Sequence, residues 1–111
     1  MADRRNERLA RNESMFRDLN ERLGRHVHQP VRLGGEMSGF VCECADPDCE
    51  LIVSLDLYRY EEIRRNSQLF LISPGHEFPE VERVVERHEG YTVVRKHDDV
   101  AEIVEETDPR T

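Results

Sequence analysis

Apolar residues recur at helical spacing through the first part of the chain. They are, in order, Leu9, Ala10, Met15, Phe16, Leu19 and Leu23, and Arg, Glu, Asp and Asn fill most of the positions between them. Intervals of three, four and seven residues place such positions on one side of an α-helix. The pattern predicts an amphipathic helix of about five turns within residues 1–24, ended by Gly24 because glycine favours helix C-termini.

The narrow apolar row of this helix fits two arrangements. It can pack on the chain's own domain, or it can pair with a partner helix or with its own copy, because heptad-like spacing suits both. In the second arrangement Asn12 lies in the seam near Leu9 and Phe16, where a polar residue sets the register. The helix is therefore a candidate surface for a protein partner or for a homodimer.

Residues 25–39 form a connector, since glycine and proline interrupt them repeatedly. Within this segment Val31 and Leu33 indicate a short edge strand. The following residues predict strands at 40–44 and 51–55, and the Asp-Pro-Asp sequence between them is typical of a tight turn. Two short strands with thiolates at the turn between them have the layout of a zinc knuckle, although the usual Cys-x2-Cys spacing is absent.

The rest of the chain is predicted to alternate between strands and helices. We expect a helix at 57–65 that Asp56 caps, a buried strand at 69–72 and another strand at 91–95. A last short helix begins at Asp99. The polar residues 107–111 are expected to form a frayed tail.

One more helix is predicted between Pro79 and Gly90. Its apolar face consists of Val81, Val84, Val85 and His88, which follow one another at helical spacing. Proline is favoured in the first turn of a helix and glycine just after its end. These signals agree on a helix in this segment.

Composition gives this chain little material for a core. Of its 111 residues, 37% are hydrophobic and 36% are charged, with no Trp and a mean hydropathy of -0.75. A bound metal stabilises such a small fold because the unfolded chain lacks the site. No apolar run is long enough to cross a membrane and no secretory signal is present, so we expect a cytoplasmic protein whose thiols stay reduced.

Charge is unevenly distributed along the chain. Residues 1–25 contain seven Arg and five acidic residues, which gives this segment a net charge of +2. Because the whole chain has a net charge of -8, the other residues carry a net charge of -10. An acidic body repels phosphate backbones, which makes nucleic acid an improbable partner.

Three cysteines, Cys42, Cys44 and Cys49, lie within ten residues of each other and are the only ones in the chain. Residues i and i+2 of a strand share a face, so Cys42 and Cys44 point the same way. The turn then brings Cys49 back toward them. Soft thiolates at this spacing favour zinc, with buried unligated thiols or redox chemistry as the alternatives.

A fourth ligand would complete a tetrahedral site, and His76 is the best candidate. It ends a Ser-Pro-Gly-His turn directly after the buried strand at 69–72. His88 has a place on an apolar helical face, and the others (His26, His28 and His97) have the pattern of surface residues. Asp46 and Asp48 are possible ligands, but turn formation explains them more simply.

The expected fold class is α+β. A long N-terminal amphipathic helix precedes a small zinc-stapled mixed domain, residues 40–106, with short strands and two or three short helices. Four protein ligands leave no open position on zinc, which favours a structural site over a catalytic one. Three thiolates also favour zinc over an iron–sulfur cluster, which usually takes four.

Three segments carry a resemblance to a known family. They are residues 8–23, the Phe-Val-Cys-Glu-Cys-x4-Cys segment 40–49, and the Pro-Gly-His-Glu turn 74–77 that leads into 79–86. Together they resemble an uncharacterised family of small proteins of actinobacterial type. The resemblance implies that the three cysteines and His76 form one set, and it implies no reaction; Leu51 departs from the polar residue expected after the cysteines.

The leading functional hypothesis is a small non-enzymatic zinc protein, a regulator or adaptor, that presents its N-terminal helix to a protein partner. One alternative is a metal-dependent enzyme with an open zinc position, in which Glu43 or Glu77 is the base. Another is a zinc-thiol redox sensor in which Cys44 or Cys49 is oxidised. No catalytic motif is present in the sequence.

Overall fold

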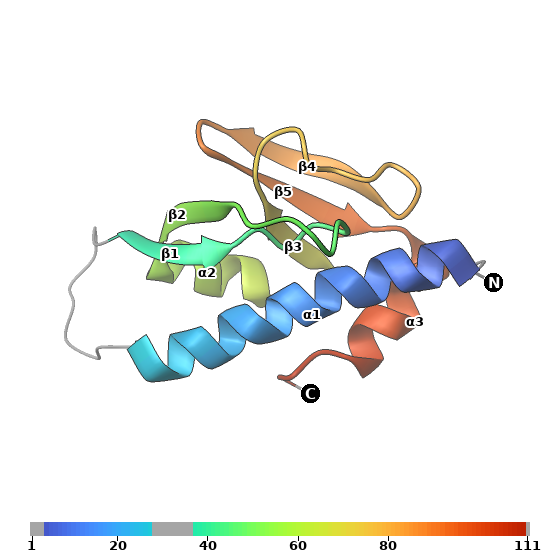
Figure 1. The fold of residues 1–111 in the computed structure, drawn as a ribbon, viewed down its shortest axis with the longest axis horizontal. Coiled ribbons are helices and arrows are strands. Elements are labelled where there is room, and N and C mark those ends of the chain that lie inside the picture. The colour runs from blue at the N-terminus through green and yellow to red at the C-terminus, as the bar shows by residue number, and fades with distance from the viewer. Residues whose placement is uncertain (1–3, 28–36, 111) are drawn as a thin grey trace.

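The computed structural model describes residues 4–27 and 37–110 and has the predicted α+β architecture. Its helices are α1 (Arg4–Val27), α2 (Leu57–Arg64) and α3 (Asp98–Glu106). Its strands are β1 (Met37–Val41), β2 (Ile52–Asp56), β3 (Leu69–Ile72), β4 (Glu82–His88) and β5 (Tyr91–Lys96). Figure 1 shows α1 lying along the length of the molecule, with α3 beside it and the strands on the other side.

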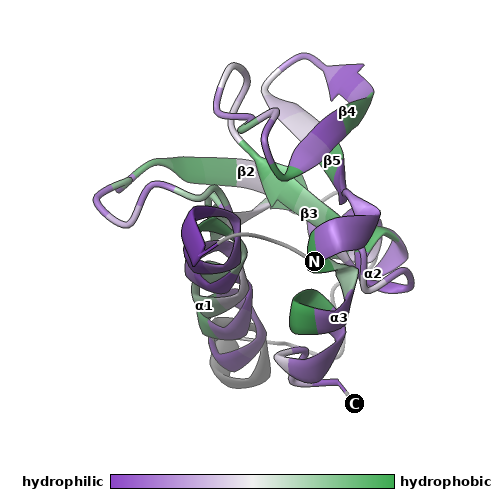
Figure 2. Ribbon diagram, turned by 90° about the vertical axis from the view of Figure 1, so that its right-hand side faces the viewer, coloured by the Kyte–Doolittle hydropathy of each residue, from purple (hydrophilic) through white to green (hydrophobic). Residues whose placement is uncertain are grey.

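The N-terminal helix α1 packs on its own chain. Leu9, Ala10 and Phe16 are buried in the core, which is the first of the two arrangements that the pattern allowed. Met15 and Leu19 keep 53% and 41% of their surface exposed. Figure 2 shows hydrophilic and hydrophobic residues mixed along α1, whereas β3 is hydrophobic. The buried face of α1 is therefore not purely apolar.

Polar side chains complete that buried face. Glu13 of α1 and Glu82 of β4 both accept from the Lys96 ammonium of β5, and all three side chains are buried. Arg17 lies over the Phe70 ring, with its guanidinium carbon 4.1 Å from the ring centroid. Charged groups as well as apolar contacts therefore hold α1 to the sheet of β3, β4 and β5.

Strands β1 and β2 form an antiparallel pair in which Phe40 lies opposite Val53. Both side chains point into the core, and the Phe40 ring stacks on Tyr60 of α2 with centroids 4.3 Å apart. β1 lies earlier than the predicted strand 40–44, because Cys42 and the residues after it leave the strand to form the loop that carries the cysteines. The segment 42–51 therefore joins two paired strands.

The second sheet has the strand order β3-β5-β4, and both pairings are antiparallel. Phe70 and Val94 face each other at its centre, and β3 is the buried strand that the sequence predicted. Asp56 caps α2 as expected, since its carboxylate accepts from the backbone N–H of Tyr58 at 2.8 Å. α3 begins at Asp98, just before the predicted cap.

The helix predicted between Pro79 and Gly90 is wrong, because this segment contains strand β4. Residues 82, 84 and 86 are less exposed than the residues between them, but two of the three are glutamates, so the apolar residues do not show the period of a strand. A bulge between Val84 and Glu86 also shifts the pairing with β5. Gly90, at φ +91°, belongs to the β4–β5 turn rather than to a helix end.

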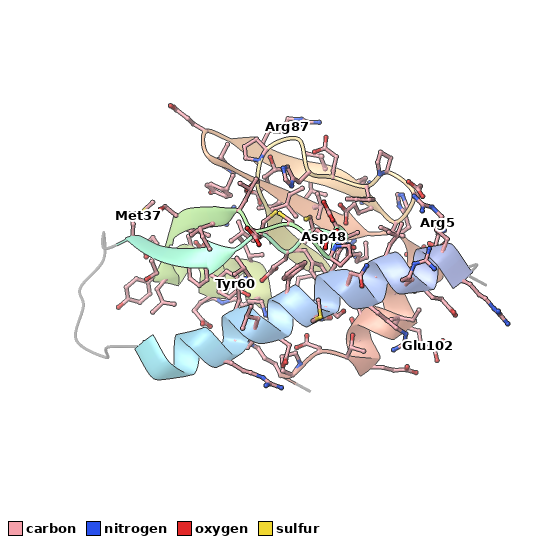
Figure 3. All side chains as sticks on the ribbon, viewed as in Figure 1. Arg5, Met37, Asp48, Tyr60, Arg87 and Glu102 are labelled. Atoms are coloured by element: carbon pink, nitrogen blue, oxygen red, sulfur yellow. The ribbon has the colours of Figure 1, made fainter. Side chains whose placement is uncertain are left out.

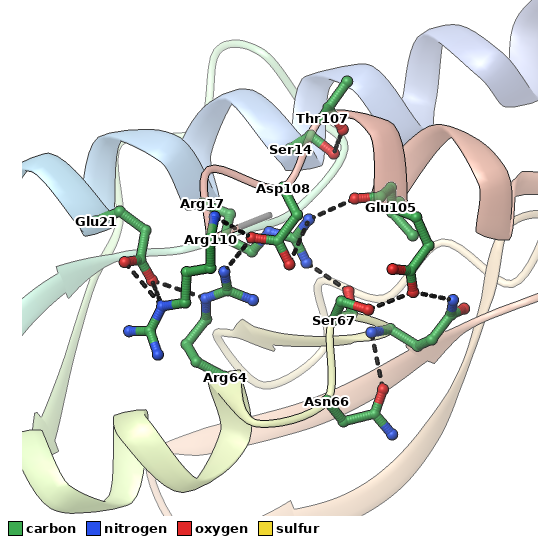
Figure 4. Close-up of polar contacts among 12 residues, drawn as sticks. Ser14, Arg17, Glu21, Arg64, Asn66, Ser67, Glu105, Thr107, Asp108 and Arg110 are labelled. Carbon is green, nitrogen blue, oxygen red and sulfur yellow. Dashed lines mark hydrogen bonds and ion pairs between the residues drawn. The ribbon is translucent and has the colours of Figure 1, made fainter.

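The frayed tail is a second correction, for residues 107–110. Asp108 is buried and accepts from Arg64 at 2.5 Å, and Arg110 contacts Glu21 of α1 at 2.9 Å (Figure 4). These ion pairs hold the polar segment after α3 against α1 and α2. The strand predicted around Val31 and Leu33 lies outside the described residues, as does Thr111.

Candidate metal centre

Cys42, Glu43 and Cys44 continue from β1 in an extended conformation between the two sheets. The backbone N–H of Cys42 donates to the C=O of Leu51 at 3.0 Å, and the N–H of Glu43 donates to the C=O of Leu71 in β3 at 2.8 Å. Successive side chains of an extended chain point to opposite sides. The two cysteines therefore share one side, as predicted, and Glu43 occupies the other.

A tight loop returns the chain from Cys44 to Cys49. The Asp46 carboxylate accepts from the backbone N–H of Asp48 at 2.9 Å, and the Asp46 C=O accepts from the N–H of Cys49 at 3.1 Å. Asp46 and Asp48 thus form the turn, which was the simpler of their two predicted roles. Figure 3 shows sulfur atoms close to the loop that carries Asp48.

A second turn places His76 beside the cysteines. The backbone N–H of His76 donates to the C=O of Ser73 at 3.1 Å, and Gly75 between them has φ +86°. Proline at the second position and a residue of positive φ at the third define a type II turn, for which glycine is the preferred residue. The Pro-Gly sequence therefore determines the direction in which the histidine leaves β3.

Cys42, Cys44, Cys49 and His76 meet at one point. One ligand atom from each lies within 4.8 Å of all the others. The Nδ1 atom of His76 is 3.7 Å from Sγ of Cys49 and 3.9 Å from Sγ of Cys42. Sulfur ligands around a tetrahedral zinc ion lie about 3.8 Å apart, given Zn–S distances of about 2.3 Å. These four residues can therefore hold a metal ion.

Two other histidines have different environments. His88 stacks on Tyr91 at the exposed end of the β4–β5 hairpin and contacts the Glu86 carboxylate at 2.8 Å. His97 lies 2.9 Å from the C=O of Pro79. His28 and the side chain of His26 lie outside the described part of the chain. Neither His88 nor His97 belongs to the cluster, and the core position predicted for His88 is not found.

The environment of the site stabilises one thiolate. The sulfur of Cys42 accepts a hydrogen bond from the Cys44 thiol and a second one, at 3.1 Å, from the backbone N–H of Ser73. These bonds lower the pKa of Cys42 to about 6, because together they outweigh the opposite effect of burial. The same hydrogen bond to Cys42, with burial, raises the pKa of Cys44. A bound cation requires its cysteine ligands as thiolates, so it would also displace the proton of the Cys44 thiol.

Glu43 has a role that the sequence did not suggest. Its carboxylate is buried and accepts from the Tyr60 hydroxyl at 2.6 Å, Asn20 Nδ2 at 2.7 Å and the backbone N–H of Leu71 at 3.0 Å. These partners lie in α2, α1 and β3. Burial raises the pKa of Glu43, and the three hydrogen bonds oppose that effect. Because all three hold the carboxylate away from the cysteine side of the chain, Glu43 is not placed to act as a base there.

Helix α1 contacts the backbone of the cysteine segment directly. Asn20 donates to the C=O of Val41 at 2.9 Å and accepts from the N–H of the same residue at 2.8 Å. Asn12 donates to the C=O of Ala45 at 3.0 Å. Asn12 therefore holds the loop of its own chain, where the sequence had suggested a seam with another helix. Nothing in the sequence singled out Asn20, because its partners lie far away along the chain.

Comparison with known proteins identifies no relative of this chain. No protein-family model matches the chain, and no curated protein and no solved structure is significantly similar to it. Among the described residues, no helix is both long enough and apolar enough to cross a lipid bilayer. The function is therefore inferred from the residues of the site and of the surface.

Proposed function

We propose that Cys42, Cys44, Cys49 and His76 bind one zinc ion as a structural site, and that the chain is a small non-enzymatic zinc protein that acts as a regulator or adaptor. The observation that supports this most strongly is the convergence of three sulfurs and one imidazole nitrogen within 4.8 Å. Thiolate and imidazole ligands in tetrahedral sites favour zinc over harder cations. Reduced thiols are available in the cytoplasm, where we place the protein.

The position of the cluster supports a structural role for the ion. Cys42 and Cys44 follow β1, Cys49 precedes β2, and His76 follows β3. An ion bound by all four joins the β1–β2 hairpin to the end of the second sheet. Four protein ligands complete a tetrahedral shell, which leaves no position for a substrate or an activated water.

Elemental analysis of purified protein tests the proposal. We expect about one zinc per chain in the wild type, and a large loss of zinc in Cys49→Ser and in His76→Ala. The matched control is His88→Ala, which removes an exposed histidine outside the cluster and should retain its zinc. Absence of metal from the wild type, or full zinc content in both ligand variants, would contradict the assignment.

A zinc-thiol redox sensor is a second candidate, because Cys49 is only partly buried and Cys42 has a lowered pKa. Reaction of two thiolates with hydrogen peroxide and two protons gives a disulfide and two waters, and the zinc ion is released. Zinc release in step with loss of two thiols would support this candidate. An unchanged thiol count under mild peroxide would remove it.

A further inference from the structure

The face of α1 that points away from the core carries a continuous row of exposed side chains. The row consists of Arg4, Arg8, Arg11, Met15, Leu19 and Arg22. Each is three or four residues from the next, which keeps the row on one side of the helix. Coiled-coil seams use the same spacing. The two exposed apolar side chains lie in its centre, and arginines lie on both sides of them.

This row has a positive charge that its surroundings do not neutralise. Arg22 pairs with Asp18 at 3.0 Å, but Arg8 and Arg11 form no ion pair within residues 4–27 and 37–110. A surface with an apolar centre and unpaired cations beside it is complementary to a partner surface that is apolar in the middle and acidic at its margins. Charge of this kind steers association and excludes partners of like charge.

A second copy of α1 is a poor occupant for this row. Parallel pairing places Arg8 and Arg11 opposite the same arginines. Antiparallel pairing centred on Met15 and Leu19 brings Arg11 next to Arg22 of the other copy. Like charges at these distances disfavour the pair. Nucleic acid is disfavoured for a different reason, because the residues after 25 carry a net charge of -10.

The helix is also held in place before any partner arrives. Asn12 and Asn20 bind the cysteine segment, and Arg17 donates to the C=O of Val104 at 2.8 Å. Arg17 and Asn20 lie on the side of α1 away from the row, and Asn12 lies beside the row. A partner therefore meets a surface whose helix is already ordered, which reduces the entropy lost on binding.

We infer that the row Arg4, Arg8, Arg11, Met15, Leu19 and Arg22 docks an acidic amphipathic helix of a protein partner. That helix presents Leu or similar side chains at seam spacing to Met15 and Leu19, and Glu or Asp to the arginines. The inference rests on the adaptor role proposed above, and it names the chemistry of the partner and the surface that recognises it.

A synthetic peptide of about three heptads, with Leu at the seam and Glu beside it, is the probe. Fluorescence anisotropy at physiological ionic strength should show that it binds the full-length zinc-loaded protein. Arg8→Glu combined with Arg11→Glu should weaken binding at least about tenfold, because each arginine then becomes a repulsive charge. The matched control combines Arg65→Glu and Arg83→Glu, two exposed arginines outside α1, and should leave binding unchanged.

Four results would overturn the inference. These are no binding to the wild type, equal binding of a peptide with Lys in place of Glu, binding that survives the Arg8/Arg11 change, and tighter binding of duplex DNA than of the acidic peptide. Zinc content is measured on every sample. Failure of peptide binding in a protein that holds its zinc counts against the docking surface alone, whereas absence of zinc counts against the proposed metal site.

Discussion

At the scale of single residues, buried polar side chains connect parts of this fold that are distant in sequence. Glu43, Arg17 and Asn20 are buried. Glu43 and Arg17 each contact at least two segments that are distant in sequence, and Asn20 contacts one, the segment after β1. Leaving any of their partners unpaired costs free energy, because a buried donor or acceptor has no water to replace the lost bond. The clustering of the cysteines and the burial of many apolar residues could be predicted from the sequence. The burial of a charged residue could not, because it depends on partners that come near only in the folded chain.

Gly75 is the residue whose conformation most directly positions His76. Alanine there has open space around its Cβ but must adopt φ +86°, so Gly75→Ala should lower the free energy of unfolding by about 1–2 kcal/mol. The metal-free protein can relax this strained turn, whereas the zinc-bound protein must keep it. Zinc affinity should therefore fall by up to about tenfold. Denaturant unfolding and competitive chelator titration measure the two effects.

Gly90→Ala is the control for that substitution. Gly90 has nearly the same φ, +91°, and its Cβ would also be in open space, but it lies in the β4–β5 turn away from the cluster. We expect a similar loss of stability with unchanged zinc affinity. Equal effects of both substitutions on zinc affinity would contradict the role given to the Ser73–His76 turn.

Asp108 should make stability depend on pH in the acidic range. Burial would raise its pKa, but hydrogen bonds from Arg64 and from the backbone N–H of Arg110 lower it below the ordinary value. A lowered folded-state pKa means that this contribution is present above about pH 4, the ordinary value for Asp, and is lost as pH falls through the folded-state pKa. The wild type should therefore lose part of its stability advantage over Asp108→Asn as the solution is acidified.

Unfolding of both proteins by urea at a series of pH values measures that difference. The gap in the free energy of unfolding should be largest near neutral pH and narrow at low pH. A gap that stays constant from neutral to strongly acidic pH would show that the Asp108 carboxylate has the same pKa in the folded and unfolded states.

At the scale of elements, α1 and the cysteine segment support each other. Two asparagines of α1 bind the backbone of residues 41 and 45, and one of them also binds Glu43 between the first two cysteines. The sequence predicted the helix because its apolar spacing is regular, but the predicted end at Gly24 is wrong, since α1 continues to Val27. It predicted β4 wrongly because Glu82 takes an inward position to meet Lys96, so the hydrophobic pattern does not follow the strand.

Asn20→Ala tests the link between these two elements. The substitution leaves the backbone N–H of Val41 without its partner and removes one donor from Glu43, so we expect a loss of about 2 kcal/mol in the free energy of unfolding. The matched control is Leu19→Ala, the exposed neighbour in the same helix, which should change stability by no more than about 0.5 kcal/mol. Equal effects in thermal or denaturant unfolding would show that Asn20 does not secure the segment.

At the scale of the whole molecule, a thin core and a cluster of residues that can hold a metal ion are complementary features. With 36% of residues charged, hydrophobic burial alone gives a modest margin of stability. The composition indicated that hydrophobic burial alone is a weak source of stability. The three cysteines and His76 could be predicted as a set, because a strand and two turns with strong local sequence signals place them. How α1 and the polar segment after α3 dock could not be predicted, because it depends on long-range ion pairs such as Arg64–Asp108.

Removal of the metal should therefore destabilise the entire domain. A ligand present at about a thousandfold excess over its Kd stabilises a protein by about 4 kcal/mol, which corresponds to more than about 10 °C in Tm for a chain of this size. Calorimetry with and without a strong chelator measures the shift. Cys49→Ser, which lacks a ligand, should show little further change with chelator, and an unchanged wild-type Tm would argue against a structural ion.

Above all, we propose that these four side chains form a complete zinc shell. X-ray absorption at the zinc edge on the purified wild-type protein tests it most directly, because sulfur and nitrogen ligands differ in distance and scattering. We predict about three sulfurs at about 2.3 Å and one nitrogen at about 2.0 Å. A shell with an oxygen ligand or fewer than three sulfurs, or protein without zinc, would show that the four residues do not form this site.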